Sequence, residues 1–301
     1  MRSAPYPLTL RQLQYLLAVA EARSFRRAAE ACHVSQPSLS QQVADAERAL
    51  GVRLFERDRR RVLVTAAGEG LLARARRVLV EADDLVEAAV RLSDPLSGTV
   101  RVGVIPTVGP YLLPRAAPAV RRALPKLAVV WEEDRTAPLV RRVSAGELDA
   151  ALLAREADLG DLVQAELAAD PFVLAAPPEH PLSRRAGPVR PGDLRGERVL
   201  LLDDGHCLRD QALEVCARGR AEELGFRATS LPTLVQMVAS GAGVTLLPSL
   251  AVEAESGRAK LRIRPFAKPA PGRTLVLAWR RGTAVEPALR AIAEAIRGAC
   301  A

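Results

Sequence analysis

The sequence lacks any apolar run long enough to span a bilayer, for which about 18 residues are needed. It also lacks a signal segment, since no short apolar stretch near the start is followed by a cleavage site. Both absences predict a cytoplasmic protein without a membrane partner. Thiols are normally kept reduced in that compartment, so a disulfide among the four cysteines would be regulatory rather than a permanent staple.

Catalytic and metal-binding signatures are missing as well. The chain has no glycine-rich phosphate loop, no HExxH motif and only three histidines. Cys32 and His33 are adjacent but have no further ligand nearby in the sequence, so we expect Cys32 to pack in a core. These features predict a protein that is not an enzyme and that needs neither a metal nor a cofactor.

The sequence does contain an excess of positive charge, and this charge is unevenly spread. The formal net charge is +8 and the isoelectric point is about 10. Residues 1–61 hold 11 arginines and six acidic residues, so this first fifth of the chain alone carries +5. A concentrated basic segment favours a polyanionic partner such as nucleic acid.

Three short helical patterns occupy residues 10–50. Ser24 can cap the second helix, and Ser35 can cap a third helix that stops at Gly51. Two short helices joined by a brief turn in a basic context predict a helix-turn-helix. The arginine-rich residues 53–64 predict a two-stranded wing that contacts the DNA backbone or the minor groove. The alternative is an ordinary three-helix bundle beside a solvated basic loop.

Residues 66–92 form a long helical pattern with a strict seven-residue repeat. Its large positions are Leu71, Val78, Leu85 and Leu92, and an alanine follows four positions after each of the first three. This alternation predicts a close-packed pair of helices and therefore a homodimer, in which two DNA modules would bind a two-fold related site. The alternative is a helix that packs only on its own domain.

From residue 99 onward, strand-like runs alternate with helical patterns. Strands are expected near residues 99–105, 128–131, 148–153, 172–176, 199–202, 244–247 and 274–279, with helices near 112–123, 136–145, 208–219, 233–240 and 284–298. This alternation predicts mostly parallel sheets with helices on both sides. Thr107 and Thr136 each follow one of the first two strands, at the edge where such folds bind ligands, although either residue could simply cap a helix.

Residues 201–216, LLDDGHCLRDQALEVC, hold two cysteines nine positions apart. The DDG triplet predicts a turn that would put Cys207 in the first turn of a helix, where the helix dipole favours an anion. His206 and Arg209 add hydrogen-bond donors and positive charge, which promote a reactive thiolate. Nine helical residues hold the Cα atoms of Cys207 and Cys216 about 13 Å apart, whereas a disulfide needs about 4.4 to 6.8 Å. The two cysteines can therefore bond only if the helix unwinds, and the alternative is that both are merely buried apolar residues.

The motifs of the first 68 residues resemble the winged helix-turn-helix of the LysR family of transcription regulators. They are SFRRAAEACHVSQPSLSQQ at residues 24–42, LGVRLFER at residues 50–57 and VTAAG at residues 64–68. The resemblance implies a set of residues that contact the DNA operator: Ser35, Gln36, Ser38, Ser40 and Gln41 on the third helix, with Arg57 and Arg59 on the wing.

The same resemblance implies the organisation of the whole chain. Residues 8–65 would form the winged helix-turn-helix, residues 66–92 the linker and dimerisation helix, and residues 98–301 an α/β, periplasmic-binding-protein-like regulatory domain. This domain would have two subdomains. Subdomain I would hold about residues 98–169 and 271–301, and subdomain II about residues 170–270.

GHCLRDQA followed by a second cysteine, together with IPTVGPYLLP at residues 105–114, resembles the hydrogen-peroxide-sensing members of this family. The resemblance implies that Cys207 reacts with peroxide and that Cys216 resolves the product to a disulfide. The pocket residues would be Thr107, Thr136, His206 and Arg209. Implied partners are operator DNA, hydrogen peroxide, RNA polymerase, a thiol reductant and further copies of the chain as dimers or tetramers.

Two other functions are compatible with parts of the sequence. A LysR-type regulator could instead bind a small organic effector in the cleft between its subdomains, with both cysteines structural. A thiol peroxidase would also need a reactive cysteine, but the predicted DNA module argues against an enzyme.

Overall fold

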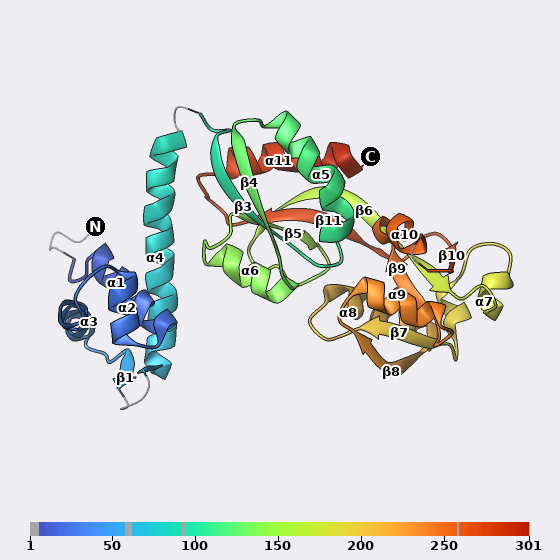
Figure 1. Cartoon of the computed structure of the whole chain (residues 1–301), viewed down its shortest axis with the longest axis horizontal. Helices are drawn as coiled ribbons and strands as arrows, with labels where there is room; N and C mark the ends of the chain where they lie inside the picture. Colours follow the sequence, from blue (N-terminus) through green and yellow to red (C-terminus); the bar gives the residue numbers. More distant parts are fainter. Residues whose placement is uncertain (1–5, 58–61, 92–93, 258, 301) are drawn as a thin grey trace. The chain divides into compact units, whose positions relative to one another are not determined.

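The structure is a computed structural model that describes residues 6–57, 62–91, 94–257 and 259–300. The chain divides into two units, Met1–Val90 and Arg91–Ala301 (Figure 1).

The first unit contains three short helices, a hairpin and one long helix. The elements are α1 (Leu10–Ala22), α2 (Phe25–Ala31), α3 (Gln36–Leu50), the antiparallel strands β1 (Phe55–Arg57) and β2 (Val62–Val64), and α4 (Ala66–Arg91). The hydroxyls of Ser24 and Ser35 accept hydrogen bonds from first-turn N–H groups of α2 and α3, and Gly51 ends α3 in the left-handed conformation. These caps confirm the predicted helix boundaries.

The wing is attached to the helices by two contacts. The Glu47 carboxylate on α3 accepts hydrogen bonds from the backbone N–H groups of Leu54 and Phe55, at 2.6 and 3.1 Å. The rings of Phe55 and Phe25 meet edge to face with centroids 6.2 Å apart. A half-buried carboxylate and an aromatic pair therefore fix the start of the hairpin against α2 and α3.

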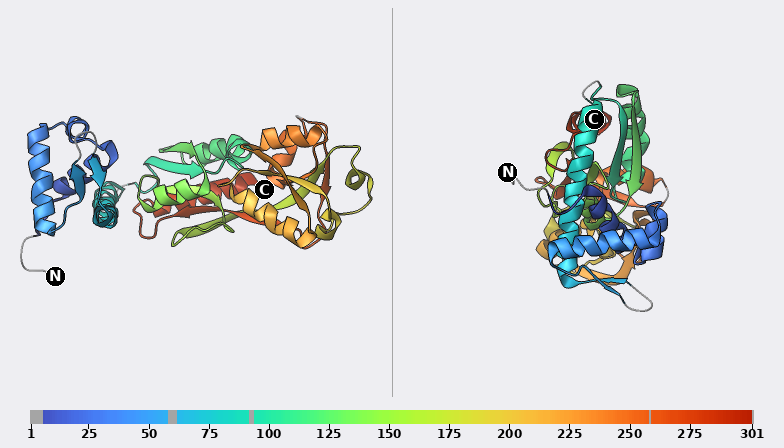
Figure 2. Two further views of the ribbon diagram at one scale, coloured as in Figure 1. Left: turned by 90° about the horizontal axis from the view of Figure 1, so that it is seen from below. Right: turned by 90° about the vertical axis from the view of Figure 1, so that its left-hand side faces the viewer.

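Helix α4 is a single unbroken helix in Figure 1 and in the right-hand view of Figure 2. Its first turns belong to the core of the first unit, where Leu72 and Ala75 are buried. Farther along, Val78 and Leu85 are exposed, and Leu92 lies outside the described residues. The two parts of the seven-residue repeat therefore differ. Its first positions pack on the chain's own first unit, whereas Val78 and Leu85 leave an apolar surface exposed to solvent.

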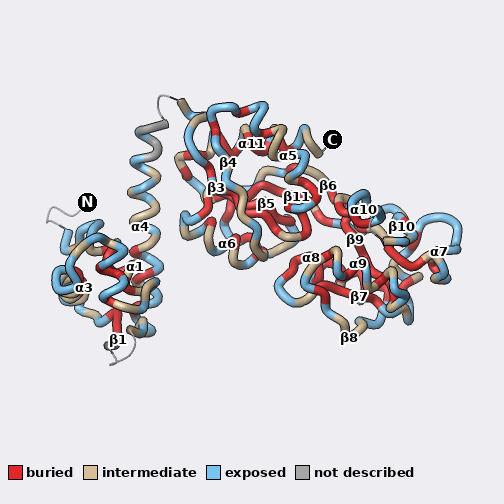
Figure 3. The backbone as a smooth tube through the Cα atoms, in the orientation of Figure 1, coloured by how far each residue is buried: buried red, intermediate tan, exposed pale blue. Residues whose placement is uncertain are grey.

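The second unit has two lobes, each with its own buried core (Figure 3). Lobe I contains β3 (Gly98–Val104), β4 (Leu127–Glu133), β5 (Ala150–Ala154), α5 (Gly109–Ala123), α6 (Thr136–Ser144) and α11 (Glu286–Cys300). Strand β3 pairs in parallel with both β4 and β5. Helices α5 and α11 pack together on one face of this sheet and α6 lies on the other (Figure 1).

Lobe II is built around a second, smaller set of strands. It contains β7 (Arg198–Leu202), β8 (Glu222–Ala228), β9 (Thr245–Pro248) and β10 (Arg262–Pro265), the helices α7 (Pro181–Arg184), α8 (Cys207–Gly219), α9 (Leu231–Ala239) and α10 (Ser249–Ser256), and a 3₁₀ turn at Pro191–Leu194. Strands β7 and β8 are parallel, and Val244 before β9 bridges to Val199 in β7.

Two long strands, β6 (Val163–Ala176) and β11 (Gly272–Trp279), connect the lobes. Strand β6 pairs with β11 over its first half and with β9 and β10 over its second half, and all of these pairings are antiparallel. The prediction of mostly parallel sheets is therefore wrong for this unit, whose main sheet is mixed. The connecting strands carry the chain out of one lobe and back into it, so they run against their neighbours instead of following a crossover helix.

Candidate functional site

The turn that precedes α8 places Cys207 at the start of that helix. Strand β7 ends at Leu202, Gly205 adopts a left-handed conformation with φ 90°, and His206 is the N-cap residue. Cys207 is the first residue of α8 and is buried. Its sulfur therefore lies at the positive end of the helix dipole, as the sequence predicts.

A small pocket surrounds this sulfur. It is lined by the segment 105–107 after β3, by Arg135 and Thr136 at the start of α6, and by the segment 205–207. The structure thus brings Thr107, Thr136, His206 and Cys207 together from three separate parts of the chain. The empty space between these side chains is about 150 Å³ including open solvent, and none of it can hold a water-sized sphere. The pocket is therefore closed in this conformation, and a ligand can enter only after part of its wall moves.

Thr107 is held in place by a buried ion pair that connects the lobes. Arg273 on β11 donates from Nη1 to the Thr107 hydroxyl at 2.8 Å and from Nη2 to the Thr107 carbonyl at 3.0 Å. Its Nε donates to Asp170 on β6 at 2.9 Å. The other oxygen of Asp170 accepts from Ser249 and from the backbone N–H of Leu250 at the start of α10, both at 3.0 Å. One buried network therefore links Thr107 to lobe II.

Two further polar groups of the pocket are the Thr136 hydroxyl and the His206 ring. The Thr136 hydroxyl is buried and finds no hydrogen-bond partner among the residues that the structure describes. His206 is also buried, with Nε2 3.1 Å from Asp203 Oδ1 in a geometry that does not form a hydrogen bond. Burial lowers the pKa of His206 against the opposing influence of Asp203 and so favours the neutral ring. Thr136 can therefore bind a ligand, and His206 can accept a proton.

Cys216 lies in the same helix as Cys207 but in a different core. Cys207 belongs to the core of lobe I, and Cys216 belongs to the core of lobe II. Both thiols are free. Burial raises the pKa of Cys216 to about 11, and the nearby Glu223 acts in the same direction. Nine helical residues at about 1.5 Å each keep the two Cα atoms about 13 Å apart. In this conformation Cys216 is neither within reach of Cys207 nor ionised at neutral pH.

The predicted operator-facing residues lie on or next to α3. Four of these residues are exposed: Ser35, Gln36, Ser38 and Gln41. Ser40 is half-buried, and the Ser35 hydroxyl accepts from the backbone N–H of Ser38 at 3.3 Å, so Ser35 also caps the helix. Arg57 ends β1, and Arg59 lies outside the described residues.

The acidic residue on this face of α3 is neutralised locally. Asp45 Oδ1 accepts from Arg48 at 2.8 Å and from the Gln41 amide at 3.0 Å. Asp45 therefore does not present an unpaired negative charge toward a DNA phosphate.

Comparison with protein families covers both units. Residues 93–301 match the LysR substrate binding domain, and residues 10–69 match the bacterial regulatory helix-turn-helix protein of the lysR family. The chain belongs to the LysR family. This confirms the resemblance seen in the sequence and the expected fold, a winged helix-turn-helix followed by a periplasmic-binding-protein-like domain.

Several LysR-family relatives match nearly the whole chain. The DNA-binding transcriptional dual regulator OxyR of Escherichia coli (strain K12) is 45% identical over 291 residues, covering 96% of this chain and 95% of that protein. A full-length OxyR variant from Pseudomonas aeruginosa has a similar structure, with a TM-score of 0.79, 38% identity and coverage of 96% and 95%. A hydrogen-peroxide-bound OxyR mutant from Corynebacterium glutamicum has a TM-score of 0.67, 32% identity and coverage of 99% and 94%.

Arg209, which the sequence analysis expects in the pocket of this LysR protein, is not one of the residues that line it. Arg209 extends along the turn, where Nη1 donates to the Leu202 carbonyl at 3.1 Å, Nε pairs with Asp204 at 3.0 Å and Nη2 with Glu223 at 2.8 Å. The guanidinium ties β7, the turn and β8 together. Its position supports the start of α8 from within lobe II, outside the set of residues that line the pocket.

The sequence analysis missed four residues in or near the Cys207 pocket: Arg135, Asp170, Gln211 and Arg273. Asp170 and Arg273 each stand directly beside an apolar run, PFVLAA in β6 and TLVLAW in β11, and a charge at the edge of such a run is the signal that could have marked them. Gln211 is buried one helical turn after Cys207, and neither its amide nitrogen nor its oxygen has a hydrogen-bond partner within the described part of the chain. Arg135 carries no such signal, because only the fold brings it to the turn before α8.

Two further expectations concern what the LysR chain lacks. Within the described ranges, no group of three or more histidine, cysteine, aspartate or glutamate side chains is arranged to hold a metal ion. Likewise, no helix in the part of the chain that the structure describes is both long and apolar enough to cross a membrane.

Proposed function

We propose that this chain is a DNA-binding transcription regulator that senses hydrogen peroxide through Cys207. The observation that carries the proposal is the small pocket in which a sulfur at a helix N-terminus meets two threonines and a buried histidine whose neutral form is favoured. The peroxide-bound Corynebacterium relative supports it, because that protein shares the fold over almost the full length. Hydrogen peroxide needs a smaller opening of this closed pocket than an organic effector does.

The reaction needs only the two cysteines and one peroxide. The Cys207 thiolate attacks one peroxide oxygen, the O–O bond breaks, and the leaving oxygen departs as hydroxide and takes up a proton to become water. Cys207 is then a sulfenic acid. The Cys216 thiolate attacks its sulfur, an S–S bond forms, and the sulfenic oxygen leaves as a second water after protonation. Two electrons have passed from the two sulfurs to one peroxide.

Thr107, Thr136 and His206 would hold the peroxide during the first step. The Thr136 hydroxyl is available for a hydrogen bond, and Arg273 fixes the Thr107 hydroxyl through a donated bond that leaves its proton free to point elsewhere. His206 can take the proton of the thiol or return one to the leaving oxygen.

The second step requires α8 to open, and two features favour this. A buried amide without hydrogen bonds costs about 1 to 3 kcal/mol, so Gln211 lowers the stability of the helix that separates the cysteines. Unwinding would also expose Cys216 to water, remove the burial that raises its pKa and restore its nucleophilicity. The change in chain conformation therefore accompanies the resolving step.

Disulfide mapping tests this function directly. We expect brief treatment of the reduced full-length protein with hydrogen peroxide, followed by alkylation and peptide mass spectrometry, to yield a Cys207–Cys216 disulfide as the main product. Cys32 and Cys300 should remain thiols during the treatment and should therefore be recovered in alkylated form. A peroxide-dependent change of the DNA footprint without this disulfide would contradict the proposed mechanism.

We also propose that α3 lies in the major groove of the operator. Gln36, Ser38 and Gln41 expose amide and hydroxyl groups that can contact base edges and phosphates, while Ser40 lies beside them. Arg57 and Arg59 on the wing would contact the backbone or the minor groove.

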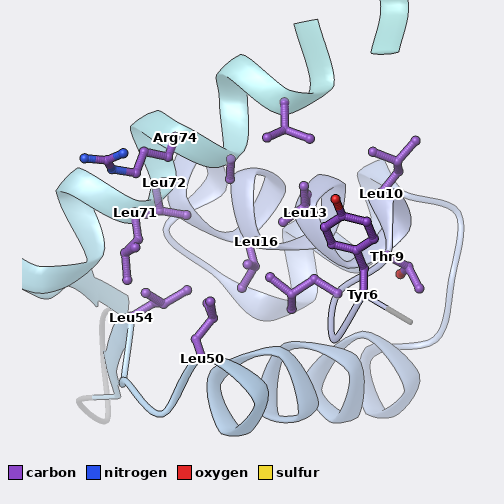
Figure 4. Close-up of a pocket in the computed structure, with 13 residues that line it drawn as sticks. Tyr6, Thr9, Leu10, Leu13, Leu16, Leu50, Leu54, Leu71, Leu72 and Arg74 are labelled. Atoms are coloured by element: carbon purple, nitrogen blue, oxygen red, sulfur yellow. The ribbon is translucent and has the colours of Figure 1, made fainter. Parts of the chain in front are cut away.

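An apolar groove in the DNA module supports a homodimer. Leucines from α1 and from the beginning of α4, among them Leu10, Leu13 and Leu71, line it (Figure 4). Val78 on α4 lines it as well. Beyond the groove, Leu85 and Val86 on α4 are 73% and 64% exposed. Exposed large apolar residues that continue a heptad pattern fit the same helix of a second copy. We therefore assign dimerisation to α4.

A Leu85→Arg variant should weaken this dimer strongly. Burying the new charge without a partner costs about 3 kcal/mol, which raises the dissociation constant roughly 150-fold. Analytical ultracentrifugation over a concentration series measures it. Asp83→Arg is the matched control, because it puts the same side chain on an exposed position of the same helix away from the repeat. Equal dissociation constants for the two variants would contradict the assignment.

The remaining partners follow from this function. We propose that the protein works in the cytoplasm, that two dimers pair into a tetramer on DNA, and that the oxidised form acts through RNA polymerase. A cellular thiol reductant would cleave the disulfide and reset the switch.

A further inference from the structure

The side chain of Arg135 lies across the turn that leads to Cys207. Arg135 is the N-cap residue of α6 in lobe I, and the turn belongs to lobe II. Its Nη2 donates to Asp203 Oδ2 at 2.8 Å and its Nη1 to the Asp204 carbonyl at 3.0 Å. A Cβ added to Gly205 would lie only 3.2 Å from the Cδ and Nη1 atoms of Arg135. The guanidinium is therefore packed directly on the backbone of this glycine.

Solvent reaches the pocket wall at Gly205 and at Arg135, whose side chain packs on that glycine. Thr107, Thr136, His206 and Cys207 are all buried, whereas the Arg135 side chain is 42% exposed. The space behind it is too small to hold even a water-sized sphere. Some part of the wall must move before a peroxide can reach the sulfur. A long side chain held by one partly exposed ion pair and one carbonyl contact moves more easily than buried residues on a strand or helix.

We propose that Arg135 is the gate of the Cys207 pocket and determines which hydroperoxides reach the sulfur. The closed guanidinium positions the turn, and a small outward movement admits hydrogen peroxide. A hydroperoxide with a bulky alkyl group needs a wider opening, which would break both contacts with the turn. This inference rests on the proposed reaction of Cys207 with peroxide.

The chemistry itself does not distinguish the two kinds of oxidant. With an alkyl hydroperoxide, the thiolate attacks the terminal oxygen, the O–O bond breaks, and the alkoxide leaves and is protonated to an alcohol. Cys207 becomes the same sulfenic acid in both cases. A difference in rate between hydrogen peroxide and a bulky hydroperoxide therefore reports access to the sulfur.

The test compares two oxidants on the reduced full-length protein. The rate of loss of the Cys207 thiol is followed by rapid alkylation and peptide mass spectrometry, with hydrogen peroxide and with tert-butyl hydroperoxide. In Arg135→Ala, we expect the rate with tert-butyl hydroperoxide to rise at least about tenfold relative to the rate with hydrogen peroxide. Arg135→Met keeps most of the bulk but lacks both contacts with the turn, and it should shift the ratio in the same direction by a smaller factor.

The matched control is Arg141→Ala, which removes an exposed arginine from the same helix without touching the pocket. Its ratio should equal that of the unmodified protein. If the ratio of the rate with tert-butyl hydroperoxide to the rate with hydrogen peroxide is unchanged in Arg135→Ala, the proposal that Arg135 is a gate is refuted. An equal slowing of both reactions would show that Arg135 only supports the turn. If the unmodified protein shows no oxidation of Cys207 by either oxidant, the proposed function fails, and the gate fails with it.

Discussion

A Cys207→Ser variant is expected to lose the entire peroxide response while binding its operator as tightly as the unmodified protein. Serine nearly matches cysteine in size, so the buried first position of α8 is retained. An alcohol does not form the nucleophilic anion that attacks peroxide at neutral pH, and no sulfenic acid can follow. Footprinting of the operator before and after peroxide, together with transcription from the same promoter, measures both properties.

The control for this variant is Cys216→Ser, which removes the resolving thiol only. There we expect Cys207 still to be oxidised and its sulfenic acid to persist long enough to be trapped by a dimedone reagent, without a disulfide. Normal switching of the Cys207→Ser protein would show that the peroxide signal enters the molecule elsewhere.

Much of the fold was predictable because its signals are local. Ser24, Ser35 and Gly51 mark helix ends through groups that lie within three residues of the cap. The same holds for the turn before α8, where the DDG triplet and the following helix put Cys207 where the sequence indicates. Local hydrogen bonding and backbone conformation fix these features, and both can be recognised in a short stretch of sequence.

The features that were not predictable depend on residues far apart in the chain. Strands β8 and β10 were missed, and the antiparallel course of β6 and β11 follows from the chain passing between two lobes. Arg209 carries the donors and the charge expected in the pocket, but these donors bind the Leu202 carbonyl and the carboxylates of Asp204 and Glu223. Which of several nearby acceptors an arginine selects is decided by tertiary packing, and sequence spacing does not encode that choice.

The position of α8 explains how one bond could reorganise the regulatory unit. Its first residue, Cys207, packs in the core of lobe I, while the remainder of its buried face, including Cys216, packs in lobe II. A bond between these two sulfurs would remove Cys207 from one core and Cys216 from its place in the other. Because packed cores have discrete arrangements, such a change would move the contacts between the lobes and not only the helix.

The buried pair of Asp170 and Arg273 should be the most sensitive structural element between the lobes. Asp170→Ala leaves a fully buried guanidinium without a counter-charge, which costs about 3 to 5 kcal/mol of unfolding free energy. Both tryptophans, Trp131 and Trp279, lie in the regulatory unit, so their fluorescence during urea unfolding reports the stability of that unit alone.

The informative comparison is the double variant Asp170→Leu with Arg273→Met. Replacing both charges by apolar groups should restore most of the lost stability, because no unpaired charge remains. Thr107, however, would still lack the two hydrogen bonds that Arg273 donates. We therefore expect the double variant to fold stably and yet to oxidise Cys207 more slowly than the unmodified protein. If Asp170→Ala were as stable as the unmodified protein, or if the double variant reacted at the normal rate, the network would not hold Thr107 in its working position.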